Sequence, residues 1–153
     1  MPTLDQKIPP PVVGALTAAA MWGLSALGPQ ASIPAGLKYA AVATLGATGI
    51  AFSLSGILAF RALCTSISPL PSAQCSALVT GGAYRISRNP MYLGVACLLL
   101  AWAVFLSALL PVAGLVAYVL YITRFQILPE ERMLAEIFGE QYTAYAARVR
   151  RWL

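Results

Sequence analysis

The chain has 153 residues, of which 59% are hydrophobic and 10% are charged. Soluble domains carry about 25% charged residues, so this composition excludes an ordinary soluble domain and predicts an integral membrane protein with one domain over 1–153. The net charge is +5, which we interpret as membrane orientation and headgroup contact and not as nucleic-acid binding.

The residues that most often bind metals are scarce. The chain has no histidine, which excludes catalysis by a histidine side chain and metal ligation by imidazole. Its cysteines, Cys64, Cys75 and Cys97, form no C-x-x-C pair. We therefore expect structural thiols and no metal site.

Four apolar segments are candidates for membrane-spanning helices, which need about 20 apolar residues each. They cover residues 12–27, 37–60, 91–108 and 111–128. Pro111 suits the first turn of a helix, which places a tight turn at 107–110 and makes the last two spans antiparallel neighbours. The predicted fold is therefore all-α, with four transmembrane helices followed by amphipathic C-terminal helices.

The distribution of basic residues predicts the orientation. With four spans, one side of the membrane holds all lysines and arginines except Lys38, which lies between the first two spans. The positive-inside rule then places both termini and the 61–90 segment in the cytoplasm. We expect a multi-pass protein of the inner or plasma membrane.

The segment YRISRNPMYLG, residues 84–94, puts polar residues at the start of the third span. In the simpler interpretation it is a helix start, with Asn89 as N-cap, Pro90 at the first helical position, and arginines that reach the headgroups. That interpretation accounts less well for Tyr84 and Tyr92. The segment is therefore also a candidate ligand site.

A second polar group lies at and just beyond the end of the fourth span. Arg124 lies inside that span, where a charge usually faces the protein interior and has a partner, although the interface is near enough for the side chain to reach water. Glu130 and Glu131 follow Pro129 and would be stabilised in the first turn of a helix. Arg124 and Glu131 are seven residues apart and would share a helix face.

Together these residues would form a polar site at the cytoplasmic ends of the spans. Arginine, paired carboxylates, an amide and tyrosines suit a zwitterionic, aromatic ligand such as S-adenosylmethionine. Methyl transfer requires alignment of the reactants more than proton transfer, so the lack of histidine is no obstacle. These considerations do not exclude a nicotinamide cofactor.

At these residues the sequence resembles the integral-membrane methyltransferases that include isoprenylcysteine carboxyl methyltransferase and the phospholipid N-methyltransferases. The matching text is LVTGGAYRISRNPMYLG at 78–94 and RFQILPEERMLAEIFGEQYTAYAARVRRW at 124–152. The resemblance covers the C-terminal half, 78–152, and rests on three motifs in the same order and at the same separations. Asn89 stands where many members have histidine, and asparagine cannot titrate.

The resemblance implies a methyltransferase whose cofactor-binding half is 78–152 and whose acceptor is lipid-like or apolar: a prenylcysteine carboxylate, a phospholipid amine or a small hydrophobic molecule. Arg124 and Glu131 would be the catalytic residues. The residues implied to bind S-adenosylmethionine are Leu78, Val79, Tyr84, Asn89, Pro90, Met91, Tyr92, Glu130 and Glu131. The expected partners are that acceptor and membrane lipids.

Two other functions stay open at this stage. Membrane sterol reductases have a related C-terminal half, so a reductase that uses NADPH is the first alternative. A non-catalytic membrane scaffold is the second, and it would leave the concentration of polar residues on one side unexplained.

Overall fold

The computed structural model describes residues 8–63 and 77–153, and within these ranges the regular structure is helical, with no strand. The elements are α1 (Pro10–Ser25), α2 (Ala35–Leu63), the 3-10 turn η1 (Gly82–Arg85), α3 (Pro90–Leu106), α4 (Pro111–Ile122), the π turn η2 (Thr123–Ile127), α5 (Leu128–Phe138) and α6 (Glu140–Ala146). Cys64 and Cys75 lie outside the described residues, and Cys97 is a free thiol.

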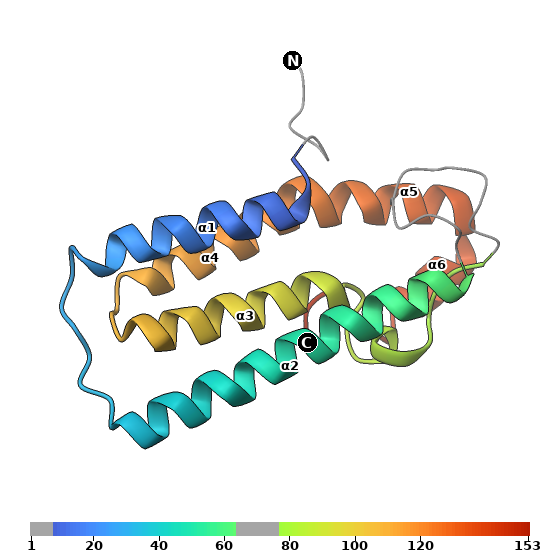
Figure 1. Cartoon of the computed structure of the whole chain (residues 1–153). Helices are drawn as coiled ribbons and strands as arrows, with labels where there is room; N and C mark the ends of the chain where they lie inside the picture. The colour runs from blue at the N-terminus through green and yellow to red at the C-terminus, as the bar shows by residue number, and fades with distance from the viewer. Residues whose placement is uncertain (1–7, 64–76) are drawn as a thin grey trace, which may run out of the picture.

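Helices α1 to α4 lie side by side and run in alternating directions (Figure 1). The connections at 26–34 and 107–110 meet at one end, where Gln30 and Ala108 form an isolated antiparallel bridge. The N-terminus of α3, α5 and α6 lie at the other end. The alternation brings all the predicted site residues to that second end.

The helix starts follow the sequence closely. Pro90 and Pro111 each occupy the first helical turn, where the missing N–H would have no intrahelical partner. The tight turn between α3 and α4 falls where it was predicted, and Ser107 ends α3 in the left-handed conformation with φ of 51°.

The junction after α4 differs from the prediction. The expected fourth span ends at residue 128 and a separate helix was expected after Pro129, but the helix continues from α4 through the π turn into α5 without an interruption. The N–H of Leu128 donates to the carbonyl of Thr123, five residues earlier. Because proline has no N–H and crowds the preceding turn, the wider π turn directly before Pro129 lets the helix continue.

Small residues bring α2 and α3 into backbone contact. A Cβ on Gly94 would overlap the Ser53 hydroxyl and the carbonyl oxygen of Gly49. On the other side of the bundle, Gly114 of α4 makes room for Met21 of α1, whose side chain is completely buried. Such close approach is typical of helices that pack inside a membrane.

The outer surface is apolar, as expected for contact with lipid. Trp22, Leu37, Leu58 and Leu120 are each more than 60% exposed. Ala35–Ala62 and Pro111–Phe138 are long and apolar enough to cross a membrane, and Pro90–Leu106 is a shorter apolar helix. The charged residues of Pro111–Phe138 other than Arg124 begin at Glu130, beyond the expected span 111–128. These helices indicate membrane association.

Candidate functional site

The N-terminus of α3 is tied to the C-terminal segment of the chain. Asn89 occupies the N-cap position, but its side chain makes no capping bond. Its amide nitrogen donates to the carbonyl of Arg151 at 3.0 Å. The buried Ser87 hydroxyl donates to the same carbonyl at 3.2 Å and accepts the N–H of Asn89 at 3.1 Å. The asparagine therefore holds the last residues in place instead of capping its own helix.

Tyr92 and Glu130 form a close pair between α3 and α5. The buried tyrosine hydroxyl lies 2.5 Å from Oε1 of Glu130. Burial raises the pKa of Glu130 to about 7, and the charge of Glu131 adds to the rise, while the bond from Tyr92 opposes it. Glu130 lies beyond residue 128, where the expected span ends, and its carboxyl can lose or gain a proton near neutral pH.

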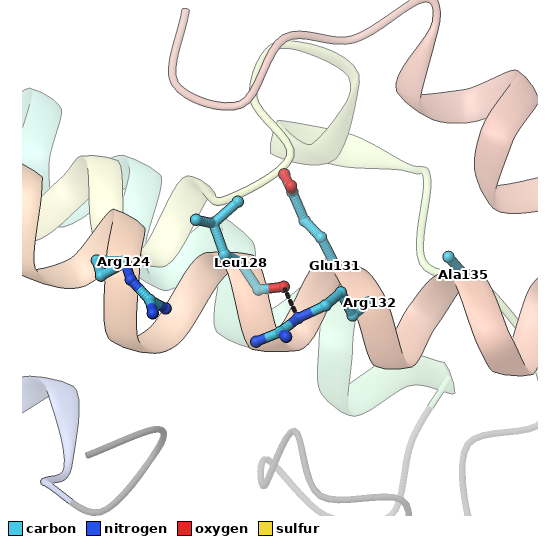
Figure 2. Close-up of a pocket in the computed structure, with 5 residues that line it drawn as sticks. All are labelled: Arg124, Leu128, Glu131, Arg132 and Ala135. Carbon is cyan, nitrogen blue, oxygen red and sulfur yellow. Dashed lines mark hydrogen bonds between the residues drawn. The ribbon is translucent and has the colours of Figure 1, made fainter. Parts of the chain in front are cut away.

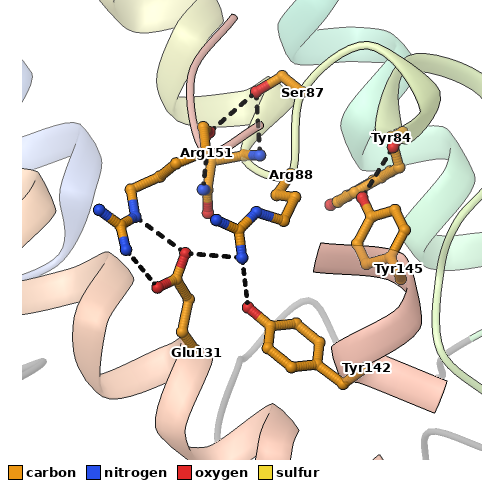
Figure 3. Close-up of polar contacts among 8 residues, drawn as sticks. Tyr84, Ser87, Arg88, Glu131, Tyr142, Tyr145 and Arg151 are labelled. Atoms are coloured by element: carbon orange, nitrogen blue, oxygen red, sulfur yellow. Dashed lines mark hydrogen bonds and ion pairs between the residues drawn. The ribbon is translucent and has the colours of Figure 1, made fainter. Parts of the chain in front are cut away.

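Glu131 is the centre of an ion-pair cluster shown in Figure 3. Arg151 contacts both its carboxylate oxygens, at 2.9 and 2.7 Å, and Arg88 approaches at 3.2 Å. Arg88 also donates to the hydroxyl of Tyr142 at 3.1 Å. The two-pronged contact is the strong form of a guanidinium–carboxylate pair. It raises the pKa of Arg151 above its ordinary value.

Two further tyrosines fix the turn before α3. The hydroxyl of Tyr145 in α6 donates to the carbonyl of Tyr84 in η1 at 2.7 Å. Both side chains are buried, and burial raises the pKa of Tyr145 to about 12, so it stays a donor at neutral pH. Tyr84 packs with Val79 against Ala59 and Phe60 of α2.

The remaining predicted residues lie close by in the chain but do not join these contacts. Leu78 and Met91 are half-buried and Pro90 is buried. Met91 packs near Gly56 of α2. The structure thus brings Asn89, Glu130, Glu131 and Tyr92 to one region, between α3, α5 and the C-terminal segment.

Arg124 is exposed, not directed into the interior. Its guanidinium lies over the ring of Phe125 at 5.5 Å, and it lines an open hollow of about 420 Å³. The other residues that line this hollow are Leu128, Glu131, Arg132 and Ala135. Figure 2 shows Arg124 and Arg132 on one side of the helix, with the Glu131 side chain directed toward the other.

Comparison with known proteins places the chain in a family. The profile of the phospholipid methyltransferase family matches residues 37–141, more than half of the chain. The chain belongs to the phospholipid methyltransferase family. The match includes most of α2 and all of α3, α4 and α5, and so it includes Asn89, Tyr92, Glu130 and Glu131.

Two known proteins are similar in sequence to shorter segments of this phospholipid methyltransferase family member. An uncharacterised protein of Haemophilus influenzae is 43% identical over 63 residues, which are 41% of this chain and all of that protein. Protein-S-isoprenylcysteine O-methyltransferase B of Arabidopsis thaliana is 39% identical over 77 residues, which are 47% of this chain and 36% of that enzyme. No solved structure shows significant similarity to the chain.

The structure of this family member adds residues that were not among the site residues expected from the sequence. They are Ser87, Arg88, Tyr142, Tyr145 and Arg151. Arg88 and the two tyrosines do belong to the matching motifs, so their polar chemistry could have drawn attention to them. Arg151 has no such signal, because one arginine among three near the end of the chain is typical of a solvated tail.

Proposed function

We propose that this chain transfers a methyl group from S-adenosylmethionine to a lipid-like or apolar acceptor at the cytoplasmic face of the membrane. We further propose that residues 1–153 form one domain with four membrane spans and both termini in the cytoplasm. The observation that carries the proposal is the partly buried Tyr92–Glu130 pair beside the Arg88–Glu131–Arg151 cluster, at one end of an apolar bundle.

The residues present suit this cofactor chemically. Glu130 offers a carboxylate to an amine or to ribose hydroxyls, and Arg88 offers a guanidinium to a carboxylate. The tyrosine rings at 84, 92, 142 and 145 supply aromatic surface for a cation or an adenine. When bound, the cofactor supplies a methyl group on a sulfonium, which an acceptor lone pair takes as the carbon–sulfur bond breaks and sulfur keeps the electron pair.

The chain's own residues would contribute binding and positioning. Tyr92 holds Glu130 in place by its hydrogen bond, and Arg151 holds Glu131 in one orientation. Arg124, at the open hollow, would orient the acceptor or stabilise its charge. Rates of displacement reactions depend strongly on such alignment. None of these roles requires a histidine.

Supporting evidence for the acceptor class comes from the family and one relative. The family is described as phospholipid methyltransferases, and the Arabidopsis relative is named for methylation of isoprenylcysteine. Both acceptors are lipid-like. A methyl acceptor with an apolar chain is therefore the proposal for this protein.

Isothermal titration of the purified, folded protein with S-adenosylhomocysteine tests the proposal. We expect a saturable heat of binding, which Glu130→Gln weakens and which Glu136→Gln, an exposed change on the same helix, leaves unchanged. Titration of the same protein with NADPH should give no heat of binding. A folded sample that binds NADPH and not S-adenosylhomocysteine would support the reductase alternative instead.

The acceptor can be sought in cells fed with deuteromethyl-labelled methionine. Mass spectrometry of lipid extracts should show a labelled lipid-like product that depends on this protein. If extracts with and without the protein are identical and S-adenosylhomocysteine does not bind, methyl transfer is the wrong function.

A further inference from the structure

The C-terminal segment, residues 150–152, is not helical, but its backbone is fixed to the turn that leads into α3. The carbonyl of Arg150 accepts the N–H of Arg88 at 3.0 Å. The next carbonyl, of Arg151, accepts both the Ser87 hydroxyl at 3.2 Å and the side-chain amide of Asn89 at 3.0 Å. Three donors of one turn are therefore satisfied by two consecutive carbonyl groups.

The side chains of the C-terminal segment reach two further elements. Arg151 donates to both carboxylate oxygens of Glu131 in α5, at 2.9 and 2.7 Å. The indole N–H of Trp152 donates to the hydroxyl of Thr123 in η2 at 3.2 Å, and its ring packs against the buried cluster that includes Tyr92. The segment thus joins the start of α3, the π turn and α5.

The family profile does not include this segment. The profile matches residues 37–141, and Asn89 and Arg151 are 62 positions apart in the chain. A role for the C-terminal segment must therefore be argued from its contacts in this structure.

The two neighbouring carboxyl groups of α5 have different surroundings. Both oxygens of Glu131 are engaged by guanidinium groups, because Arg151 contacts each of them and Arg88 approaches one at 3.2 Å (Figure 3). Glu130 accepts the hydroxyl of Tyr92 on Oε1, and its other oxygen makes no hydrogen bond to another described residue. A carboxylate held by two guanidinium groups has less to offer a cation than one with an uncommitted oxygen.

We propose that the C-terminal segment is a positioning element of the candidate site, and that Arg151 is its principal positioning residue. Arg151 keeps the Glu131 carboxylate engaged, so Glu130 is the carboxylate that binds the cationic group of the ligand. Side chains that form a binding site need such support to stay in one geometry. This assignment rests on the proposed function, because the ligand is the proposed cofactor.

Hydrogen exchange tests the attachment of the segment without any ligand. Arg151→Gln removes the pair with Glu131, and we expect faster exchange of the Arg88 amide, whose acceptor is the Arg150 carbonyl. Arg148→Gln is the control, because this exposed side chain donates to the carbonyl one turn earlier and not to the site. Equal exchange of the Arg88 amide in the parent and in Arg151→Gln would overturn the attachment through Arg151.

A double-mutant cycle distinguishes positioning from direct contact with the ligand. Arg151→Gln and Glu131→Gln should each weaken the binding of S-adenosylhomocysteine about threefold to tenfold, and the double variant should bind no more weakly than the weaker single variant, because both changes break one pair. Arg148→Gln should bind like the parent. If Glu131 contacts the ligand itself, its substitution will weaken binding further in the Arg151→Gln background, which would contradict the proposal.

The pH dependence of binding is a readout that a purely structural role would not change. Among the described residues, the groups that face Glu130 are the hydroxyls of Tyr92 and Tyr84 and the carboxylate of Glu131, and tyrosine is uncharged near neutral pH. Burial raises the pKa of Glu130 most, and the Glu131 charge raises it further. Because Arg151 offsets that charge, Arg151→Gln should move the rise in affinity to a pH about 0.5 higher.

Arg151→Lys completes the set of variants. It keeps the positive charge, so its pH profile should match that of the parent even though one hydrogen bond to Glu131 is lost. A lower melting temperature of Arg151→Gln with an unchanged pH profile would reduce Arg151 to a stabilising role and overturn the proposal. Additive losses in the cycle, with normal binding by the parent, would contradict the positioning role alone. A folded parent protein that binds no S-adenosylhomocysteine would contradict the proposed function and this assignment with it.

Discussion

A carboxyl group held between a tyrosine hydroxyl and a second carboxylate behaves differently from one in water. Glu130 has an ordinary pKa of 4.5, and in the folded protein burial raises this pKa to about 7. Between these two pH values the free protein keeps Glu130 largely protonated. A cationic ligand group that faces Glu130 favours the ionised form, so binding must release that proton.

The affinity for S-adenosylhomocysteine should therefore depend on pH. As pH rises from 6 to 8 the ionised fraction of Glu130 increases, and we expect the dissociation constant to fall by about tenfold and then level off. Titration calorimetry at several pH values measures this, and Glu130→Gln should give weak binding that varies little over the range. The same steep rise in Glu130→Gln would show that another group titrates.

Arg151 is the clearest single contributor from the C-terminal segment. Arg151→Ala removes both hydrogen bonds to Glu131 and leaves this carboxylate with Arg88. Since Arg151 is 36% exposed, we expect a loss of about 1 kcal/mol in the free energy of unfolding, visible as a lower melting temperature in detergent.

Arg150→Ala is the matched control for Arg151. Its side chain is exposed, and it holds the chain through its backbone carbonyl, which accepts the N–H of Arg88 at 3.0 Å. The melting temperature of the Arg150→Ala variant should equal that of the parent protein. Equal losses in the two variants would mean that general charge, and not the pair with Glu131, stabilises the fold.

At the scale of helices, the backbone contact between α2 and α3 is the most sensitive to a small change. In Gly94→Ala the new methyl group would overlap the Ser53 hydroxyl and the Gly49 carbonyl oxygen. We expect a loss of about 1–3 kcal/mol from overpacking, measured as melting temperature or folded yield. Gly46→Ala in α2, which meets nothing within 4 Å, should fold normally, and similar losses in both would argue against the contact.

Much of the helical layout could be predicted because its signals are local. Apolar length and the prolines at 90 and 111 placed the helix starts, and Gly139, with φ of 51°, ends α5. The π turn could not be predicted, because it is a shift in hydrogen-bond register that no characteristic amino-acid pattern accompanies. The continuous helix through Pro129 follows from that shift.

The site was predictable only in part, for a related reason. Motif residues such as Tyr92 and Glu130 carry recognisable chemistry, and the structure pairs them. The attachment of residues 150–152 to α3 and η2 depends on contacts between segments more than 60 residues apart, or about 30 for Trp152 and Thr123. No local pattern encodes such a contact, and so the partner of Asn89 emerged only from the fold.

For the whole molecule, the orientation in the membrane is a prediction that chemical labelling can test. In a background without native cysteines, Glu136→Cys should react with a membrane-impermeant maleimide only from the cytoplasmic side. Ser32→Cys, in the exposed connection between α1 and α2, should react only from the opposite side, because nearly all basic residues lie at the other end. Labelling of both from one side would contradict four spans.

The buried Met21 side chain against Gly114 sets how closely α1 and α4 approach near the 107–110 connection. A side chain at position 114 would overlap Met21 and would force these two helices apart at this end. The backbone contact between α2 and α3 does not involve either residue, so the two helix pairs of the bundle are spaced by separate contacts.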